Sequence, residues 1–266
     1  MRDTFECGQC FRWKKEDDGS YTGVIKNGVI NVNKEDDTII ICGETNENLR
    51  EICENYLDLE RDYSEIKSII SKDDKNMQTA IEYGKGIRIL NQDPWEMLIS
   101  YIISAANNIP RISKTIENIS QKFGKAIYFN GNVYYTFPTP EELSNATMEE
   151  LRKCNLGFRD KYVYEATQMV LDGKIDFEEL RKDEYEIAKK KLMKMPGVGA
   201  KVADCILLFS LGKLEAFPVD TWIKKVMNEL YIDSTNITKI NQYATNKFGK
   251  YAGIAQQYLF YYKREN

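Results

Sequence analysis

The sequence has no histidine, only six prolines among its 266 residues, and no apolar run of the length, about 18 residues, that a membrane-spanning helix needs. Its start lacks the pattern of a secretory signal peptide. These absences exclude a membrane protein and predict a soluble protein of the cytoplasm. A chain of this length can bury a sizeable core in one to three compact units.

Cysteine is scarce and scattered, with single residues at positions 7, 10, 42, 53, 154 and 205. In a cytoplasmic chain of this size we expect free thiols. Cys7 and Cys10 have the spacing of a metal or redox pair, but no second pair follows closely. Since histidine is absent as well, we expect no zinc site there.

The sequence also lacks an excess of positive charge, because its 37 basic residues are outnumbered by 41 acidic ones and the net charge is −4. An acidic balance is unusual for a protein that binds nucleic acid. Residues 1–150 carry a net −9, however, and residues 151–266 a net +5, with lysines gathered at 189–191 and 194. A locally positive surface is therefore compatible with the acidic whole. The lysine run could equally be a solvated helix face.

The first 45 residues are rich in β-branched and aromatic side chains, and they predict an antiparallel sheet. The expected strands are 11–13, 21–25, 29–32 and 38–42, and Lys26-Asn27-Gly28 between two of them is a hairpin signal. From about residue 46 the apolar spacing becomes helical. We predict an α+β protein with a sheet domain and flanking helices over residues 1–80 and a helical core over residues 81–266.

The helical unit begins with a strong start signal, because Asp93 can cap a helix that has Pro94 as its first residue. This helix is expected to run to about Ala105. Residues 128–136 read as a loop or a short hairpin. The other expected helices are 111–123, 140–145, 147–154, 161–171, 185–194, 200–211, one that starts at 221, and an aromatic-rich last helix over 252–263.

The most informative stretch is a tight turn at Pro196-Gly197-Val198-Gly199, inside a hairpin that we place at residues 195–200. Glycines permit positive φ angles and the close approach of another backbone. From Ala200 the pattern is helical, so Lys201 lies in the first turn of a helix. The free N–H groups of such a turn suit a phosphate.

Asp220 stands at the cap position of the next helix. A helix of about ten residues rises roughly 15 Å, and the linker that follows it can extend roughly 20 Å. The chain can therefore bring Asp220 back beside Lys201. An amine next to a carboxylate, above a phosphate-binding hairpin, is suited to attack at C1′ of a nucleotide sugar.

This constellation resembles the helix-hairpin-helix, Gly/Pro-Asp class of DNA glycosylases. The whole chain resembles a bacterial member of the 8-oxoguanine branch, whose members are glycosylases and AP lyases. The resemblance implies a two-lobed, all-α core behind the sheet domain, with the last helices packed between the lobes. It also implies a monomer that binds double-stranded DNA containing 8-oxoguanine, associated with the nucleoid, with no cofactor needed for catalysis. The four-cysteine iron–sulfur loop of related glycosylases is absent, because no cysteine follows Cys205.

The resemblance assigns a pocket for the extruded lesion base. Gly8, in Gly-Gln-Cys-Phe-Arg-Trp, would accept the N7 proton that 8-oxoguanine has and guanine lacks. Phe260 and Cys205 would stack on the two faces of the base, and Gln256 would bind its Watson–Crick edge. Spacing alone leaves Gln256 and Phe260 equally compatible with a core aromatic beside a surface glutamine. Lys201 and Asp220 would be catalytic.

The base opposite the lesion is assigned to a second group of residues. These are Asn107, Asn108, Arg111, Phe158 and Arg159. The family carries asparagine at the position of Ala106 and tyrosine at that of Phe158. Because each lost contact removes ~1–3 kcal/mol of discrimination, we expect a relaxed preference for cytosine opposite the lesion.

Contacts to the DNA backbone are implied for Gly197, Gly199, Val202 and Trp222, the last where relatives often carry histidine. The resemblance also implies a structural monovalent cation at the carbonyls of Met193, Met195 and Val198. Relatives carry a further strand before Gly8, so we expect the natural N-terminus to be longer. Two alternatives stay open: a monofunctional alkylbase glycosylase that uses Asp220 and water, and a non-catalytic DNA-binding hairpin module.

Overall fold

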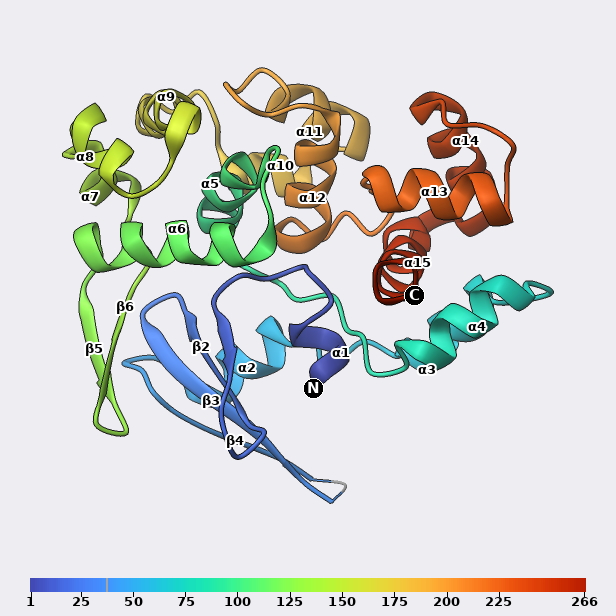
Figure 1. The fold of residues 1–266 in the computed structure, drawn as a ribbon, viewed down its shortest axis with the longest axis horizontal. Coiled ribbons are helices and arrows are strands. Elements are labelled where there is room, and N and C mark those ends of the chain that lie inside the picture. The colour runs from blue at the N-terminus through green and yellow to red at the C-terminus, as the bar shows by residue number, and fades with distance from the viewer. Residues whose placement is uncertain (37) are drawn as a thin grey trace.

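The N-terminal part is a four-stranded antiparallel sheet in the sequential order β1-β2-β3-β4 (Figure 1). The computed structural model describes residues 1–36 and 38–266. The strands are β1 (Trp13–Lys15), β2 (Tyr21–Ile25), β3 (Gly28–Glu35) and β4 (Thr38–Glu44). Ile25 pairs with Gly28 across the predicted hairpin, and Lys26 takes the positive φ of +50° that so short a turn requires.

The prediction that the chain is all strand up to residue 45 is wrong at its start. Residues Arg2–Phe5 form a short helix, α1, and the first strand begins at Trp13 instead of Phe11. Phe5 stacks on Trp13 with ring centroids 4.0 Å apart. Phe5 also packs against Tyr21, with ring centroids 5.2 Å apart, so this one buried aromatic side chain attaches the otherwise polar helical turn to the sheet.

Helices make up most of the remaining chain, joined by one β5–β6 hairpin (Ala126–Phe129 and Asn132–Tyr135) that settles the loop-or-hairpin alternative. The predicted boundary between residues 80 and 81 falls inside α4. The sequence patterns did not predict α1, α4, α10 or α14. The helices are α2 (Leu49–Tyr56), α3 (Tyr63–Ile70), α4 (Lys75–Tyr83), α5 (Pro94–Ser104), α6 (Ile109–Phe123), α7 (Pro140–Ser144), α8 (Met148–Lys153), η1 (Gly157–Arg159), α9 (Asp160–Leu171), α10 (Phe177–Lys182), α11 (Tyr185–Leu192), α12 (Ala200–Ser210), α13 (Thr221–Leu230), α14 (Ile237–Phe248), η2 (Gly249–Tyr251) and α15 (Ala252–Glu265).

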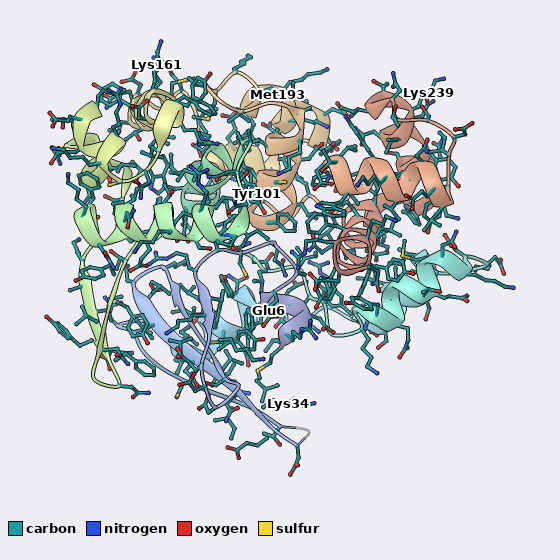
Figure 2. All side chains as sticks on the ribbon, in the orientation of Figure 1. Glu6, Lys34, Tyr101, Lys161, Met193 and Lys239 are labelled. Carbon is teal, nitrogen blue, oxygen red and sulfur yellow. The ribbon has the colours of Figure 1, made fainter. Side chains whose placement is uncertain are left out.

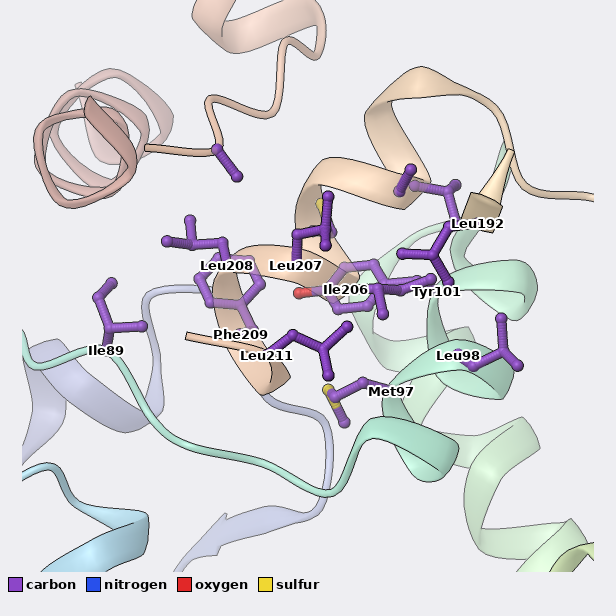
Figure 3. Close-up of a cluster of buried hydrophobic side chains, with 14 of the residues drawn as sticks. Ile89, Met97, Leu98, Tyr101, Leu192, Ile206, Leu207, Leu208, Phe209 and Leu211 are labelled. Carbon is purple, nitrogen blue, oxygen red and sulfur yellow. The ribbon is translucent and has the colours of Figure 1, made fainter. Parts of the chain in front are cut away.

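The core of the helical part lies where α5 packs against α12. Figure 3 shows this contact, with Met97, Leu98 and Tyr101 of α5 facing Ile206 and its neighbours of α12. Both helices are apolar on nearly every side and almost fully buried, as expected for central helices. The helix that carries Lys201 is therefore anchored along its length, so its first turn is held rigidly.

The last helix, α15, closes the molecule. It packs against α13 on one side and against α4 on the other, so it lies between elements from distant parts of the chain (Figure 1). Tyr83 of α4 contacts Tyr261 of α15, with ring centroids 5.4 Å apart. Within the described residues, no helix is long and apolar enough to cross a bilayer. All six cysteines are unpaired.

Candidate active site

The glycine turn takes the conformation that its sequence predicts. Gly197 has a φ of +77°, and a Cβ there would lie 3.1 Å from the side chain of Tyr162. Gly199 is the N-cap residue of α12 and provides no side-chain hydrogen bond to the helix, and a Cβ on Gly199 would meet open space. The first turn of α12 therefore presents free N–H groups on an accessible surface, which suits an anionic group.

Asp220 caps helix α13, as predicted. Its Oδ1 accepts a hydrogen bond of 2.8 Å from the backbone N–H of Ile223. Burial raises the pKa of the Asp220 carboxyl, while the Ile223 N–H and the nearby Lys201 partly oppose that shift. The carboxylate therefore sits in a partly dry site beside the amine, where its electrostatic influence on a neighbouring charge is strong.

Lys201 and Asp220 line the same pocket, so the linker between α12 and α13 does return the carboxylate to the amine. The Lys201 Nζ lies 5.4 Å from the ring centroid of Tyr101. Cys205, one helical turn after Lys201, lines the pocket as well. Burial raises the pKa of its thiol to about 11, although the nearby Lys201 has the opposite effect. Cys205 therefore contributes a neutral, polarisable surface to the pocket.

All six residues assigned to catalysis and lesion binding meet at this one pocket. Its volume is about 60 Å³, well below the ~150 Å³ of a cavity that accepts benzene in another protein. A purine base can therefore enter only if the pocket widens. The lining residues are Gly8, Tyr101, Lys201, Cys205, Phe209, Pro218, Asp220, Gln256, Gln257 and Phe260.

Gly8 lies at the point where the N-terminal segment touches the last helix. Its φ of +87° belongs to the left-handed region, and a Cβ there would lie 2.8 Å from Arg264 Nη1 and 3.1 Å from Phe260 Cε1. Only glycine fits this close approach without strain. The residues on the two sides of the pocket are more than 240 positions apart in sequence.

Gln256 supplies an unpaired acceptor to the pocket wall. Its side chain is only 4% exposed, and its Oε1 has no hydrogen-bond partner among the described residues. Buried polar atoms without a partner are uncommon and need an explanation. Phe260, four residues later on the same face of α15, is half-buried and packs against the main core.

Four lining residues were missed at the sequence level. Tyr101 and Phe209 stack with ring centroids 5.9 Å apart, and both belong to helices whose apolar patterns indicate only core. Pro218 lies in the linker before Asp220. Gln257 is 2% exposed and follows Gln256 directly, and two adjacent glutamines in an aromatic-rich helix are the one signal that could have indicated it.

The residues assigned to the opposite base gather at the turn between α5 and α6. Ala106 has a φ of +49° there, which is strained for alanine. Asn107 donates to the Ile103 carbonyl at 3.1 Å and accepts from the Asn108 N–H at 3.0 Å. Asn108 caps α6 by accepting from the Arg111 N–H. Both asparagines thus shape the turn, and the Arg111 side chain is exposed.

Phe158 and Arg159 differ sharply in exposure. Phe158 is 62% exposed, whereas Arg159 is 6% exposed. The guanidinium of Arg159 donates to the carbonyls of Ala105, Ala106 and Leu156, and it lies 4.4 Å from the Phe158 ring centroid. Burial lowers the pKa of Arg159, and Arg111 adds to the effect. In this structure Arg159 holds the turn and supports Phe158.

A hollow of about 460 Å³ beside this turn has a basic lining. Arg111 and Lys114 contribute from α6, and Arg152 from α8 pairs with Asp160 at 2.8 Å. The hollow is lined by Arg111, Lys114, Thr115, Arg152, Asn155 and Gly157. It therefore adds positive charge close to Phe158, which follows Gly157 in the chain.

The remaining assigned residues lie around the hairpin. Val202 is buried in the first turn of α12, so only its backbone is available for contacts. Trp222 is half-buried at the start of α13, with the Lys225 Nζ 5.1 Å from its ring centroid. The Met195 carbonyl accepts from the Val198 N–H.

Two family models together match most of the chain. Residues 1–98 match the N-terminal domain of 8-oxoguanine DNA glycosylase. Residues 99–249 match the HhH-GPD superfamily of base excision DNA repair proteins. The junction between the two matches lies within α5, the helix that packs against α12.

The chain is also similar to individual proteins over most of its length. It superposes on Clostridium acetobutylicum 8-oxoguanine glycosylase/lyase, solved with double-stranded DNA containing cytosine opposite 8-oxoguanine, with a TM-score of 0.96 and 43% identity, covering 100% of this chain and 91% of that one. It is 34% identical over 239 residues to a probable N-glycosylase/DNA lyase of Methanothermobacter thermautotrophicus, covering 82% of this chain and 76% of the relative. It is 32% identical over 274 residues to the N-glycosylase/DNA lyase OGG1 of Arabidopsis thaliana, covering 97% and 75%.

Proposed function

The chain belongs to the HhH-GPD superfamily of base excision DNA repair proteins, within the 8-oxoguanine DNA glycosylases, and from this premise we propose that it is an N-glycosylase and DNA lyase that excises 8-oxoguanine from double-stranded DNA. One observation carries the proposal: Lys201 and Asp220 line the same pocket as Gly8, Cys205 and Gln256. A nucleophile, a carboxylate and a base-reading wall are thus brought together.

Lesion recognition rests on the Gly8 carbonyl. No hydrogen bond among the described residues ends on this oxygen, and Gly8 lines the pocket. A carbonyl only accepts hydrogen bonds, so it favours the N7 proton of 8-oxoguanine and repels the N7 lone pair of guanine. Discrimination between the two bases therefore needs no contact to the extra oxygen.

The other walls of the pocket suit a purine with the guanine donor pattern. The unpaired Oε1 of Gln256 matches N1–H and the exocyclic amine on the Watson–Crick edge. Phe260 and Cys205 would lie against the two faces of the base, as an extruded base requires. Because the pocket is smaller than a purine, we expect Phe260 to move when the base enters.

The chemistry begins with the neutral amine of Lys201. Its Nζ lone pair attacks C1′ of the sugar, and the base departs with the electron pair of the glycosidic bond. Asp220 stabilises the positive charge that develops at the sugar. The adduct gives an N–H proton to the departing base. Its C1′–O4′ bond then breaks and O4′ takes up a proton, which leaves a protonated Schiff base that makes the C2′ proton acidic. Loss of that proton expels the 3′ phosphate and cuts the strand.

Opposite-base reading is expected to be relaxed. Ala106 offers no side-chain amide to cytosine, and Phe158 has no hydroxyl. The guanidinium of Arg159 is engaged with backbone carbonyls. Arg111 then supplies most of the remaining discrimination, and Phe158 acts as an exposed apolar wedge.

A structural monovalent cation fits the donor set of the hairpin. In the described parts of the chain, no hydrogen bond ends on the carbonyls of Met193 or Val198, whereas the Met195 carbonyl already accepts one. Backbone oxygens are ligands of the kind that hard cations prefer. Such an ion would hold the turn before α12 and take no part in bond breaking.

Borohydride trapping on a duplex with one 8-oxoguanine tests the proposal. A covalent complex with the unaltered protein, absent for Lys201→Gln, would establish Schiff-base chemistry at Lys201. Base release without a covalent complex would contradict Schiff-base chemistry at Lys201 and favour a monofunctional glycosylase that uses Asp220 and water. A protein that neither releases the base nor forms a complex would behave as a binding module.

A further inference from the structure

The segment around Gly8 is held by side chains from several distant elements. Arg264 Nη2 donates to the Glu6 carbonyl at 2.6 Å. Gln257 Nε2 donates to the Cys7 carbonyl at 2.7 Å. The Gln9 carbonyl accepts from Gln92 Nε2 at 2.8 Å and from the Tyr101 hydroxyl at 3.3 Å. The carbonyls of residues 6, 7 and 9 are therefore occupied, and that of Gly8 is not.

The Gln9 side chain strengthens this arrangement from within the segment. It is fully buried. Its Nε2 donates to the carbonyls of Thr4 and Arg88 at 2.9 and 2.8 Å, and its Oε1 accepts from the Leu90 N–H at 3.0 Å. The segment is thus fixed to the linker before α5 as well as to α15. Figure 2 labels Glu6, at the start of this segment, and Tyr101 of α5, whose hydroxyl donates to the Gln9 carbonyl.

Gln257 has a special place among these contacts. The Cys7 carbonyl belongs to the peptide unit that leads into Gly8, so a hydrogen bond to it fixes the plane from which the Gly8 φ is measured. Gly8 has no side chain to restrict its backbone, and free glycine samples both signs of φ. Without an external constraint, the direction of the Gly8 carbonyl would vary.

We propose that Gln257 is a positioning residue for lesion discrimination, which holds the Cys7–Gly8 peptide so that the free Gly8 carbonyl points at N7 of the extruded base. This inference rests on the proposed function. It joins two tasks in one helix: Gln256 reads the Watson–Crick edge, and the next residue aims the acceptor that reads the opposite edge. Preorganised acceptors discriminate better than mobile ones, because no ordering is needed when the base arrives.

The test compares Gln257→Met with Gln168→Met. Methionine keeps the length of the side chain and removes the donor. Gln168 is a half-buried glutamine of α9 outside the pocket, so its variant controls for the loss of a glutamine as such. Both variants and the unaltered protein are first compared by thermal melting. Three single-turnover rates are then measured: release of 8-oxoguanine, release of guanine, and cleavage at a preformed abasic site.

For Gln257→Met we expect an about tenfold loss in 8-oxoguanine release, in line with the loss of one buried hydrogen bond, and a narrower ratio of 8-oxoguanine to guanine release. Cleavage at the abasic site, which involves no base, should change less. Equal losses in all three rates would overturn the inference by showing a general structural role. Unchanged release of 8-oxoguanine would overturn it as well. Failure of the unaltered protein to release 8-oxoguanine would overturn the proposed function together with it.

Discussion

The lesion pocket and the opposite-base turn differ in whether their polar groups are free or already hydrogen-bonded within the protein. The pocket offers two acceptors, at Gly8 and Gln256, without a hydrogen-bond partner among the described residues, and the carbonyls next to Gly8 are satisfied by side chains from distant elements. At the turn, the side chains of Asn107, Asn108 and Arg159 make hydrogen bonds within the protein, and Asn108, Arg111 and Phe158 are exposed. Preorganised free acceptors favour stringent reading of the lesion, and engaged donors favour lenient reading of its partner.

The largest expected effect removes the nucleophile. Lys201→Gln should lower 8-oxoguanine release by about 10⁴-fold, since loss of a covalent catalyst leaves only binding and electrostatics. Binding of the lesion duplex should persist, because the pocket walls remain. Lys194→Gln is the matched control, as it removes an exposed lysine beside the hairpin and should lower affinity in a salt-dependent way. Trapping by Lys201→Gln would refute the assignment.

Asp220→Asn should come next, with release slowed by about 10²–10³-fold through lost charge stabilisation. Asparagine still caps α13, so the fold should survive. Burial raises the pKa of Asp220, which means that the carboxyl favours folding most at low pH and less as pH rises through its folded pKa. The variant has no carboxyl group at this position, so its folding stability should not fall with rising pH for this reason. Its melting temperature at neutral pH should equal or exceed that of the unaltered protein, and a clear drop would contradict this.

The two arginines of the turn should separate in their effects. Arg111→Met should reduce the preference for cytosine over adenine opposite the lesion by about tenfold, the scale of one base contact. Arg159→Met should slow release with every opposite base by a similar factor, because it loosens the turn and the support of Phe158. Single-turnover rates with the four opposite bases check this. The reverse pattern would show that Arg159 leaves its carbonyls to read the base.

The smallest expected effect comes from a substitution at Ala106. Ala106→Asn restores the side chain that relatives carry, at a φ of +49° where asparagine is favoured over alanine. We expect a gain of about 0.5 kcal/mol in the free energy of unfolding, by denaturant titration, and a modest increase in cytosine preference. A gain in stability without any change in the preference for cytosine would contradict the expectation that the missing amide relaxes this preference.

The placement of Lys201 and Asp220 in one pocket could be predicted from sequence because the geometry that fixes each of them is local. The glycine turn, the helix start at Ala200 and the cap at Asp220 are each fixed by a few neighbouring residues, and chain length alone allows their approach. Gly8 needed a family resemblance, since a lone glycine near a strand has no pattern of its own. Its requirement for glycine comes from Arg264 and Phe260, far along the chain.

Other features that the sequence did not predict also depend on distant contacts or on weak patterns. Tyr101 and Gln257 were missed because residues of buried helices show the same pattern whether they line a pocket or fill a core. Helix α14 was missed because only Ile240, Ala244 and Phe248 of its residues are buried, too narrow a stripe to stand out. The burial of Arg159 could not be foreseen, because the carbonyls that bind it belong to a turn over 50 residues earlier.

The hydrogen bond from Gln257 to Cys7 spans 250 positions of the chain, and this has a consequence for synthesis. A ribosome releases the first ten residues long before α15 is made, so the Cys7 carbonyl has no partner until the end of synthesis. Contacts between residues so far apart in sequence form slowly. We therefore expect the backbone around Gly8 to be among the last parts of the pocket to become ordered.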